Sequence, residues 1–158
     1  MALSKIQTGQ VLQVVSVDTG SISTGLNTTS TSMADITGMT ATITPTHSSS
    51  KILINYINHI YIGTAPANGW MSSKIDLYRG STRIVTAGSY PEAHLPTDTA
   101  HRYMTVCNEF FMDSPATTNA VTYKLQGASG LSGFNVQYNV TAYYNNKGGE
   151  MILMEIAQ

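Results

Sequence analysis

Short segments with an apolar residue at every second position constrain this fold more than any other feature of the sequence. In the clearest one, Met39–Pro45, the residues Met39, Ala41 and Ile43 fall on one face and three threonines fall on the other. This alternation is typical of a strand with one buried face, because successive side chains of a strand point to opposite sides of the sheet. No stretch of the chain has a helical period.

About ten such segments follow one another at fairly even spacing, with turn signals between them. The predicted strands are Val11–Val17, Thr28–Ile36, Met39–Pro45, Lys51–Ile62, Ser73–Arg79, Arg83–Ala87, Tyr103–Met112, Ala120–Leu125, Phe134–Tyr143 and Glu150–Ala157. The pattern predicts an all-β protein, an antiparallel sandwich or barrel with no substantial helix. Met1–Gln10 has no period and is predicted to be an N-terminal arm, with residues 11–158 as a single domain.

Two segments are apolar on both faces. In Lys51–Ile62 the apolar positions change parity, and a bulge near Ile57–His59 would keep them inward. In Met151–Ala157 neighbouring apolar residues fall on opposite faces. This predicts a central strand, buried on both faces, that contributes to a subunit interface.

Gly88–Ala100 is the longest stretch predicted to be irregular; it carries two prolines, two acids and His94, and His101 follows it directly. Long loops on small domains are often binding surfaces, and exposed aromatic residues favour contacts with carbohydrate or protein. Core packing explains any one of the aromatic residues equally well. The candidate partner or glycan contacts are Trp70, Tyr90, His94, His101 and Tyr103.

Catalytic patterns are missing from the sequence. His94, Asp98 and His101 have a spacing that would let a folded loop bind one metal ion. No further ligand on a rigid strand lies nearby in the sequence, so a polar loop without metal is favoured. There is no Gly-x-Ser-x-Gly nucleophile motif and no phosphate-binding loop. Most acids fall at turns or strand ends, where solvation explains them. We therefore expect no enzyme activity, no cofactor and no metal.

Charge and cysteine content exclude further classes. The net charge is −1, only 11% of residues are charged, and the cations are scattered, which argues against a nucleic-acid partner. The single cysteine, Cys107, excludes an internal disulfide, and we interpret it as a buried, unreactive thiol. No apolar stretch is long enough to span a membrane, and no signal peptide is evident, so we expect synthesis in a cytoplasm and no membrane contact.

A series of segments, with a Thr- and Ser-rich stretch between the first two, matches a known pattern in order and spacing. The segments are Gly9–Val15, Ile36–Pro45, Ser48–Ile54, Leu77–Thr82, Phe111–Thr118, Val121–Gln126 and Ile152–Ala157. Together they resemble a family of small virion domains of tailed bacteriophages. The resemblance implies a jelly-roll-like sandwich that works as a homotrimer and has no catalytic residues.

Relatives in that family are tail-fibre tips and other surface proteins of the virion. Only Met1–Gln10 precedes the first predicted strand here, and no long shaft does. We therefore expect a head decoration or cement protein on the virion surface, made in the host cytoplasm, whose arm docks to the major capsid protein. The alternative is a tail-fibre tip, held by tail proteins, that binds a host receptor or surface glycan.

Overall fold

The computed structural model describes residues 7–20, 22, 24–63, 70–94, 103–140 and 148–158, and within these ranges it contains ten strands and no helix. The strands are β1 (Val11–Asp18), β2 (Leu26–Thr28), β3 (Ala34–Ile43), β4 (Lys51–Ile62), β5 (Trp70–Arg79), β6 (Thr82–His94), β7 (Tyr103–Asp113), β8 (Val121–Ser129), β9 (Val136–Tyr138) and β10 (Glu150–Ile156). The prediction of an all-β protein is confirmed.

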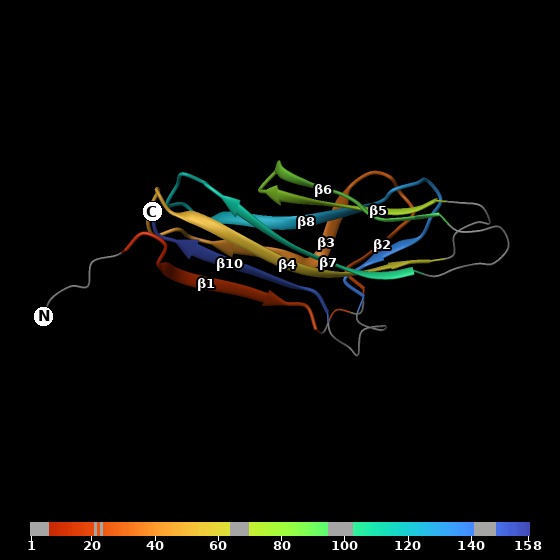
Figure 1. Ribbon diagram of the computed structural model, residues 1–158, viewed down its shortest axis with the longest axis horizontal. Coiled ribbons are helices and arrows are strands. Elements are labelled where there is room, and N and C mark those ends of the chain that lie inside the picture. Colours follow the sequence, from red (N-terminus) through yellow and green to blue (C-terminus); the bar gives the residue numbers. More distant parts are fainter. Residues whose placement is uncertain (1–6, 21, 23, 64–69, 95–102, 141–147) are drawn as a thin grey trace, which may run out of the picture.

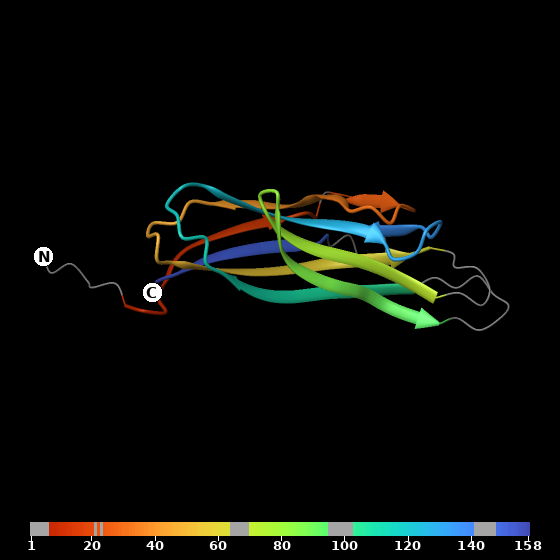
Figure 2. The same ribbon diagram turned by 90° about the horizontal axis from the view of Figure 1, so that it is seen from above.

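The strands form two antiparallel sheets that face each other (Figures 1 and 2). The six-stranded sheet has the order β1-β10-β4-β9-β2, and β7 pairs with the free side of β4. The four-stranded sheet has the order β3-β8-β5-β6. Without the short strands β2 and β9, the sheets are β1-β10-β4-β7 and β3-β8-β5-β6, which is the jelly-roll arrangement of eight strands in a two-sheet sandwich.

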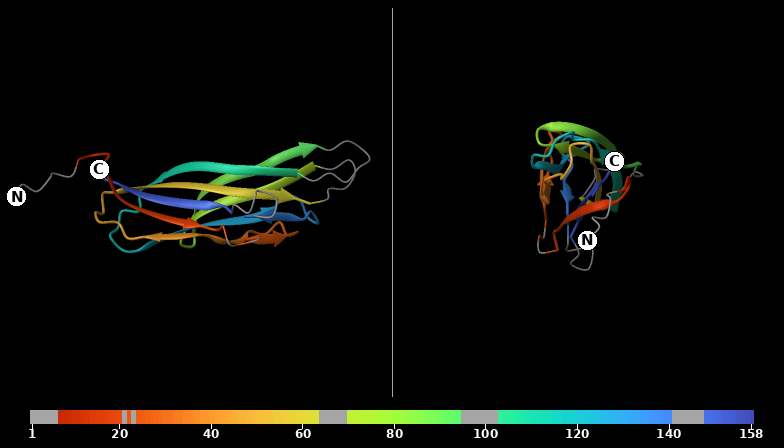
Figure 3. Two further views of the ribbon diagram at one scale, coloured as in Figure 1. Left: turned by 90° about the horizontal axis from the view of Figure 1, so that it is seen from below. Right: turned by 90° about the vertical axis from the view of Figure 1, so that its left-hand side faces the viewer.

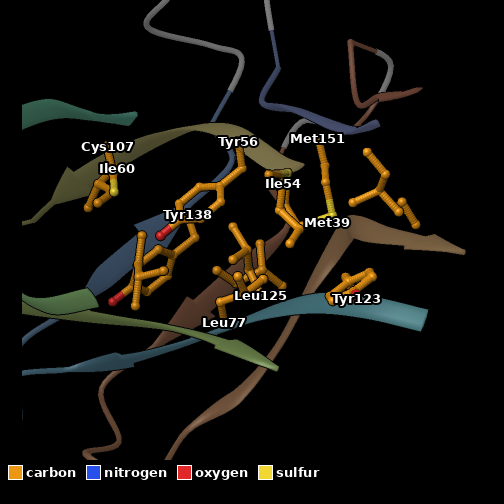
Figure 4. Packing of buried hydrophobic residues seen from close by; sticks show 14 of the residues in the cluster. Met39, Ile54, Tyr56, Ile60, Leu77, Cys107, Tyr123, Leu125, Tyr138 and Met151 are labelled. Carbon is orange, nitrogen blue, oxygen red and sulfur yellow. The ribbon is translucent and has the colours of Figure 1, made fainter. Parts of the chain in front are cut away.

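The core lies between the sheets and consists mainly of branched aliphatic and tyrosine side chains (Figure 4). Tyr56, Tyr123 and Tyr138 are among the largest side chains that are fully buried. The hydroxyl of Tyr138 lies within hydrogen-bonding distance of the carbonyl oxygens of Lys74 and Ala128. Because burial disfavours the phenolate, the pKa of Tyr138 is raised above its ordinary value. Its ring also fills the space beside Gly127, where a Cβ would come within 2.8 Å of it.

The bulge expected near Ile57–His59 is wrong. β4 pairs with β7 without a register shift from Ile52 opposite Asp113 to Ile62 opposite Tyr103. The strict alternation turns Asn58 inward, where its side chain is fully buried. A polar partner on the facing loop takes the place of the bulge, since the backbone N–H of Asn139 donates a hydrogen bond to Asn58 Oδ1 at 3.3 Å.

Asn139 is the centre of a buried polar cluster, and its backbone is in the left-handed region with φ 54°. Its Oδ1 accepts hydrogen bonds from Thr19 Oγ1 at 2.7 Å and from the N–H of Gly149. Its Nδ2 donates to the carbonyl oxygen of Thr37 at 3.2 Å. One side chain thereby joins the end of β1, the middle of β3 and the start of β10.

The strand expected over Thr28–Ile36 is wrong in its middle. β2 ends at Thr28 and β3 begins at Ala34. The hydroxyl of Thr28 accepts a hydrogen bond from the N–H of Ser30, and the hydroxyl of Ser30 accepts one from the N–H of Ser32. Such local bonds from Ser and Thr favour turns over strands, which explains the break.

The irregular stretch expected over Gly88–Ala100 is wrong in its first half. β6 continues to His94 because β5 offers it a partner as far as Trp70. The strand expected over Phe134–Tyr143 is shorter in the structure, where β9 covers only Val136–Tyr138. Residues 141–143 of the expected strand lie outside the described residues.

The strand ends define two ends of the sandwich. At the proximal end, β1, β4 and β8 begin and β3, β7 and β10 finish, close to the C-terminus (Figures 1 and 3). Within the predicted arm, Gly9 donates its N–H to the carbonyl of Ala157, and Ala157 donates its own to Gln10. At the distal end, β4 and β6 finish and β5 and β7 begin.

Candidate interaction surfaces

Two buried carboxylates hold the proximal end together. Asp113, the last residue of β7, accepts hydrogen bonds from Arg79 Nη1 at 3.0 and 2.9 Å and from the hydroxyl of Tyr123 at 2.7 Å. Arg79 ends β5 and Tyr123 lies in β8, so these bonds tie the edge of the six-stranded sheet to the four-stranded sheet. Burial, and then the hydrogen bond to Asp113, raise the pKa of the Tyr123 phenol well above its usual value.

Glu155 of β10 is the second carboxylate, and its side chain is fully buried. Its Oε1 accepts hydrogen bonds from the N–H and hydroxyl of Thr46, both at 2.8 Å, and from the N–H of His47 at 3.3 Å. Its Oε2 accepts one from Gln13 Nε2 at 2.7 Å. Burial by itself would raise the pKa of this carboxyl, but hydrogen bonds from Gln13 and Thr46 help to outweigh burial, and the pKa is lowered to about 2.

These carboxylates correct the expectation that acids at strand ends are solvated. Asp113 is 9% exposed and Glu155 is not exposed at all. Asp76, within β5, is 4% exposed, and its Oδ2 lies 3.4 Å from Nη1 of Arg83. The alternation along β10 could have predicted that Glu155 is buried, because Glu155 lies on the same inward face as Met151 and Leu153.

The outer face of the six-stranded sheet carries an apolar area, which we call the outer patch. Register places Val14, Met154, Leu53 and Met112 in one row across four strands, and Ile152 and Phe110 in the next row, beside Ser16 and Asn55. Val14 is 56% exposed, Phe110 67% and Met112 44%. The outer patch consists of Val14, Leu53, Phe110, Met112, Ile152 and Met154.

β10 is central in its sheet, between β1 and β4, as predicted. Its two faces differ, however, since Met151, Leu153 and Glu155 are buried while the alternate residues are only half-buried. Within one chain it is therefore not buried on both faces. The part of the prediction that assigns its outer face to a subunit interface stays a prediction.

β7 leaves one open side of the sandwich. It pairs with β4 along its whole length, and no described strand pairs with its other edge. A pocket of about 170 Å³ lies beside this edge, between β7 and β6. Its lining residues are Tyr56, Leu77, Val85, Thr86, Glu109, Phe110 and Phe111.

Three of the five contact residues that the sequence suggests lie at the distal end. Trp70 begins β5 and pairs with His94, which ends β6, while Tyr103 begins β7 and is 37% exposed. Tyr90 lies four residues before the end of β6, opposite Ser73. His101 lies outside the described residues. The backbone therefore brings Trp70, His94 and Tyr103 to the same end.

Within the described residues no three His, Cys, Asp or Glu side chains are grouped so as to hold a metal ion, and Asp98 and His101 lie outside those residues. Cys107 is buried and free, and burial followed by the charge of Glu109 raises the pKa of its thiol to about 12. Among the described residues no helix is long and apolar enough to cross a membrane.

No protein-family model matches the chain, and no curated protein sequence matches it. Solved structures with a similar arrangement include a chain of infectious bursal disease virus, Gx strain, at 10% identity and a TM-score of 0.40, covering 94% of this chain and 37% of that one. A chain of the Gt strain has 10% identity and a TM-score of 0.39, covering 100% and 40%. A mutant VP2 protein of the same virus, in derived T=1 particles, has 12% identity and a TM-score of 0.36, covering 99% and 38%.

The chain thus spans 37% to 40% of the length of these proteins. At such scores the similarity carries no argument about this chain. The functional case rests on its own residues.

Proposed function

We propose that this protein is a non-enzymatic structural protein of a tailed-bacteriophage virion, and that it works as a trimeric decoration or cement protein on the capsid surface. One observation carries the proposal. The segments through which the sequence resembles that family all reach the proximal end of the sandwich, although they come from the whole length of the chain.

The strand bounds show how this comes about. Three segments cover the starts of strands: Gly9–Val15 of β1, Ser48–Ile54 of β4 and Val121–Gln126 of β8. Three others cover the ends of β3, β7 and β10, and Leu77–Thr82 is the hairpin between β5 and β6. Since neighbouring strands are antiparallel, starts and ends alternate along one edge, and the segments meet there.

Hydrogen bonds also connect the elements that meet at the proximal end. Asp113 joins the two sheets there, and Glu155 holds the turn at Thr46–His47 against β10. Gly9 and Gln10 are bonded to Ala157 at the same end. We infer that this rigid end faces the capsid and that the arm, Met1–Gln10, reaches the major capsid protein from it.

Position in the particle tests the proposal. Antibody against the purified protein, detected with gold in electron micrographs of intact virions, is expected to label the head at many sites. Label confined to the tail would refute the decoration role. A particle carrying a deletion of the gene provides the control for labelling, and its reduced resistance to heat or osmotic shock is the expected phenotype of a lost cement protein.

A receptor- or glycan-binding tail tip is the second candidate function. It is favoured by the placement of Trp70, His94 and Tyr103 at the distal end, away from the proximal end. The variants Trp70→Ala and Tyr103→Ala test it in a host-adsorption assay, with Leu131→Ala as a control for an exposed apolar residue. A tail tip requires slower adsorption in both variants and unchanged adsorption in the control. Equal adsorption in all three would leave only the decoration role.

A further inference from the structure

The outer patch is an apolar surface on the six-stranded sheet that the core of one chain does not use. We infer that it is the surface through which copies of this chain pack against one another in the oligomer. The inference rests on the proposed trimer and adds to it the identity of the interface.

The outer patch is continuous because strand pairing places its members side by side. Val14 is opposite Met154, Met154 is opposite Leu53, and Leu53 is opposite Met112. Ile152 and Phe110 extend the patch into the next row, where both are opposite Asn55. Exposed apolar residues scattered singly are normal on a protein surface, whereas a contiguous group of this kind marks an interaction site.

The amide group of Asn55, which lies between Ile152 and Phe110, already has hydrogen-bond partners for its donors. Asn55 donates from Nδ2 to Oδ1 of Asn108 at 2.9 Å and to the carbonyl of Glu109 at 3.1 Å. Burying Asn55 under a partner therefore leaves no donor of its amide unpaired, which removes the usual cost of covering a polar group.

Among the described residues, charge lies only at the borders of the outer patch. Lys51 is at one end of β4, while Asp18 and Glu150 form the row beyond Ser16 and Ile152. A surface with no charge at its centre meets a second copy of itself without repulsion between like charges. A partner of opposite charge would find nothing to pair with there, so a further copy of the chain is the occupant that fits.

The size of the face agrees with this occupant. Four strands at about 4.8 Å spacing give a width of about 19 Å, and paired lengths of about 23 to 36 Å give a projected area of roughly 450 to 700 Å². Side chains that stand out from a sheet make the accessible area larger than its projection. A stable interface buries about 800 Å² on each partner, so the face is large enough for one.

The open edge of β7 points to the same conclusion. β7 supplies Phe110 and Met112 to the outer patch, and its outer edge has no strand beside it in the described structure. A long apolar edge strand attracts uncontrolled pairing unless something covers it. If the copies form a closed ring through the outer patch, a neighbouring copy lies next to this edge and prevents uncontrolled strand pairing there.

Light scattering coupled to size-exclusion chromatography tests the inference on the full chain. The wild-type protein is expected to have three times the 17.0 kDa mass of one chain. Phe110→Asp would place an unpaired charge in the interface, so at least 100-fold weaker association and a monomer at micromolar concentration are expected. The matched control is Leu131→Asp, at a residue that is 39% exposed in the turn after β8, and it is expected to remain trimeric.

Each result decides something different. A trimeric Phe110→Asp variant, or a monomeric control, would overturn the interface while leaving the trimer intact. A monomeric wild type would overturn the trimer of the proposed function and the interface with it, whereas labelling of virions would still test the decoration role. If Phe110→Asp does not fold, as judged by circular dichroism, Val14→Asp on β1 makes the same test from the other side of the outer patch.

Discussion

Replacing Asn139 with alanine is expected to destabilise the protein more than any other single change in its polar residues. The side chain of Asn139 makes three hydrogen bonds in the buried cluster, with Thr19, Gly149 and Thr37. Alanine removes all three, and each is worth about 1 kcal/mol, with more lost where the abandoned partner stays buried. The left-handed backbone at φ 54° adds about 1 kcal/mol, since alanine adopts it less readily than asparagine.

Together these contributions amount to about 3 to 5 kcal/mol, a large share of the stability of an ordinary domain. Urea unfolding followed by tyrosine and tryptophan fluorescence measures the loss, with every variant at the same protein concentration because an oligomer is stabilised by mass action. The wild-type and variant curves are expected to have similar slopes and different midpoints.

Two further variants separate the backbone contribution from the side-chain contribution. Asn139→Gly keeps the left-handed backbone and loses the hydrogen bonds, so it is expected to recover only about 1 kcal/mol relative to alanine. Asn139→Asp keeps the acceptor for Thr19 and Gly149 but cannot donate to Thr37. A loss below about 1 kcal/mol for Asn139→Ala would refute the reasoning, because it would mean that the buried cluster contributes nothing net.

Other changes probe the carboxylates and the thiol. Glu155 has a pKa of about 2 in the folded protein against 4.5 for a free glutamate, so its contribution to the free energy of unfolding, up to about 3 kcal/mol, is complete above pH 4.5 and is lost as the pH falls toward 2. Glu155→Gln is expected to reduce the fall of the melting temperature over this acidic range. An unchanged dependence of the melting temperature on pH would contradict the assignment. Asp113→Ala is expected to cost about 2 to 4 kcal/mol and Tyr123→Phe about 1 kcal/mol in urea unfolding, with equal losses arguing against the role of Arg79. Cys107 is expected to resist a thiol reagent at pH 8 until the protein is unfolded, and fast labelling of the native protein would show that the strand is not buried.

Alternation along the chain was enough to predict most of the strands. β4, β7 and β10 lie within a residue or so of the expected bounds because their apolar positions leave no other face for the core. The break after Thr28 was missed because threonine and serine are compatible with a strand. Their hydroxyls can also form hydrogen bonds with nearby backbone N–H groups, and such bonds favour a turn. The choice between these roles depends on whether a partner strand is present, and single-strand patterns do not contain that information.

The proximal end shows the same limit for functional residues. Asp113, Arg79 and Tyr123 are far apart in the sequence and meet only because antiparallel pairing brings their strand ends together. The same applies to the outer patch, whose members come from four strands. Among the candidates from the sequence, Trp70, His94 and Tyr103 do share one end, because β5 and β7 begin there and β6 ends there.

The pairing of β1 with β10 has a consequence for the synthesis of the protein. The first strand of the sandwich finds its partner among the last residues of the chain, from Val11 opposite Ile156 to Asp18 opposite Glu150. Until the ribosome has released those residues, β1 has no place in the sheet and the core lacks Met151 and Leu153. The nascent chain must therefore keep the apolar strands of this sandwich apart until β10 has been synthesised, which predicts slow folding and a need for chaperones at high expression.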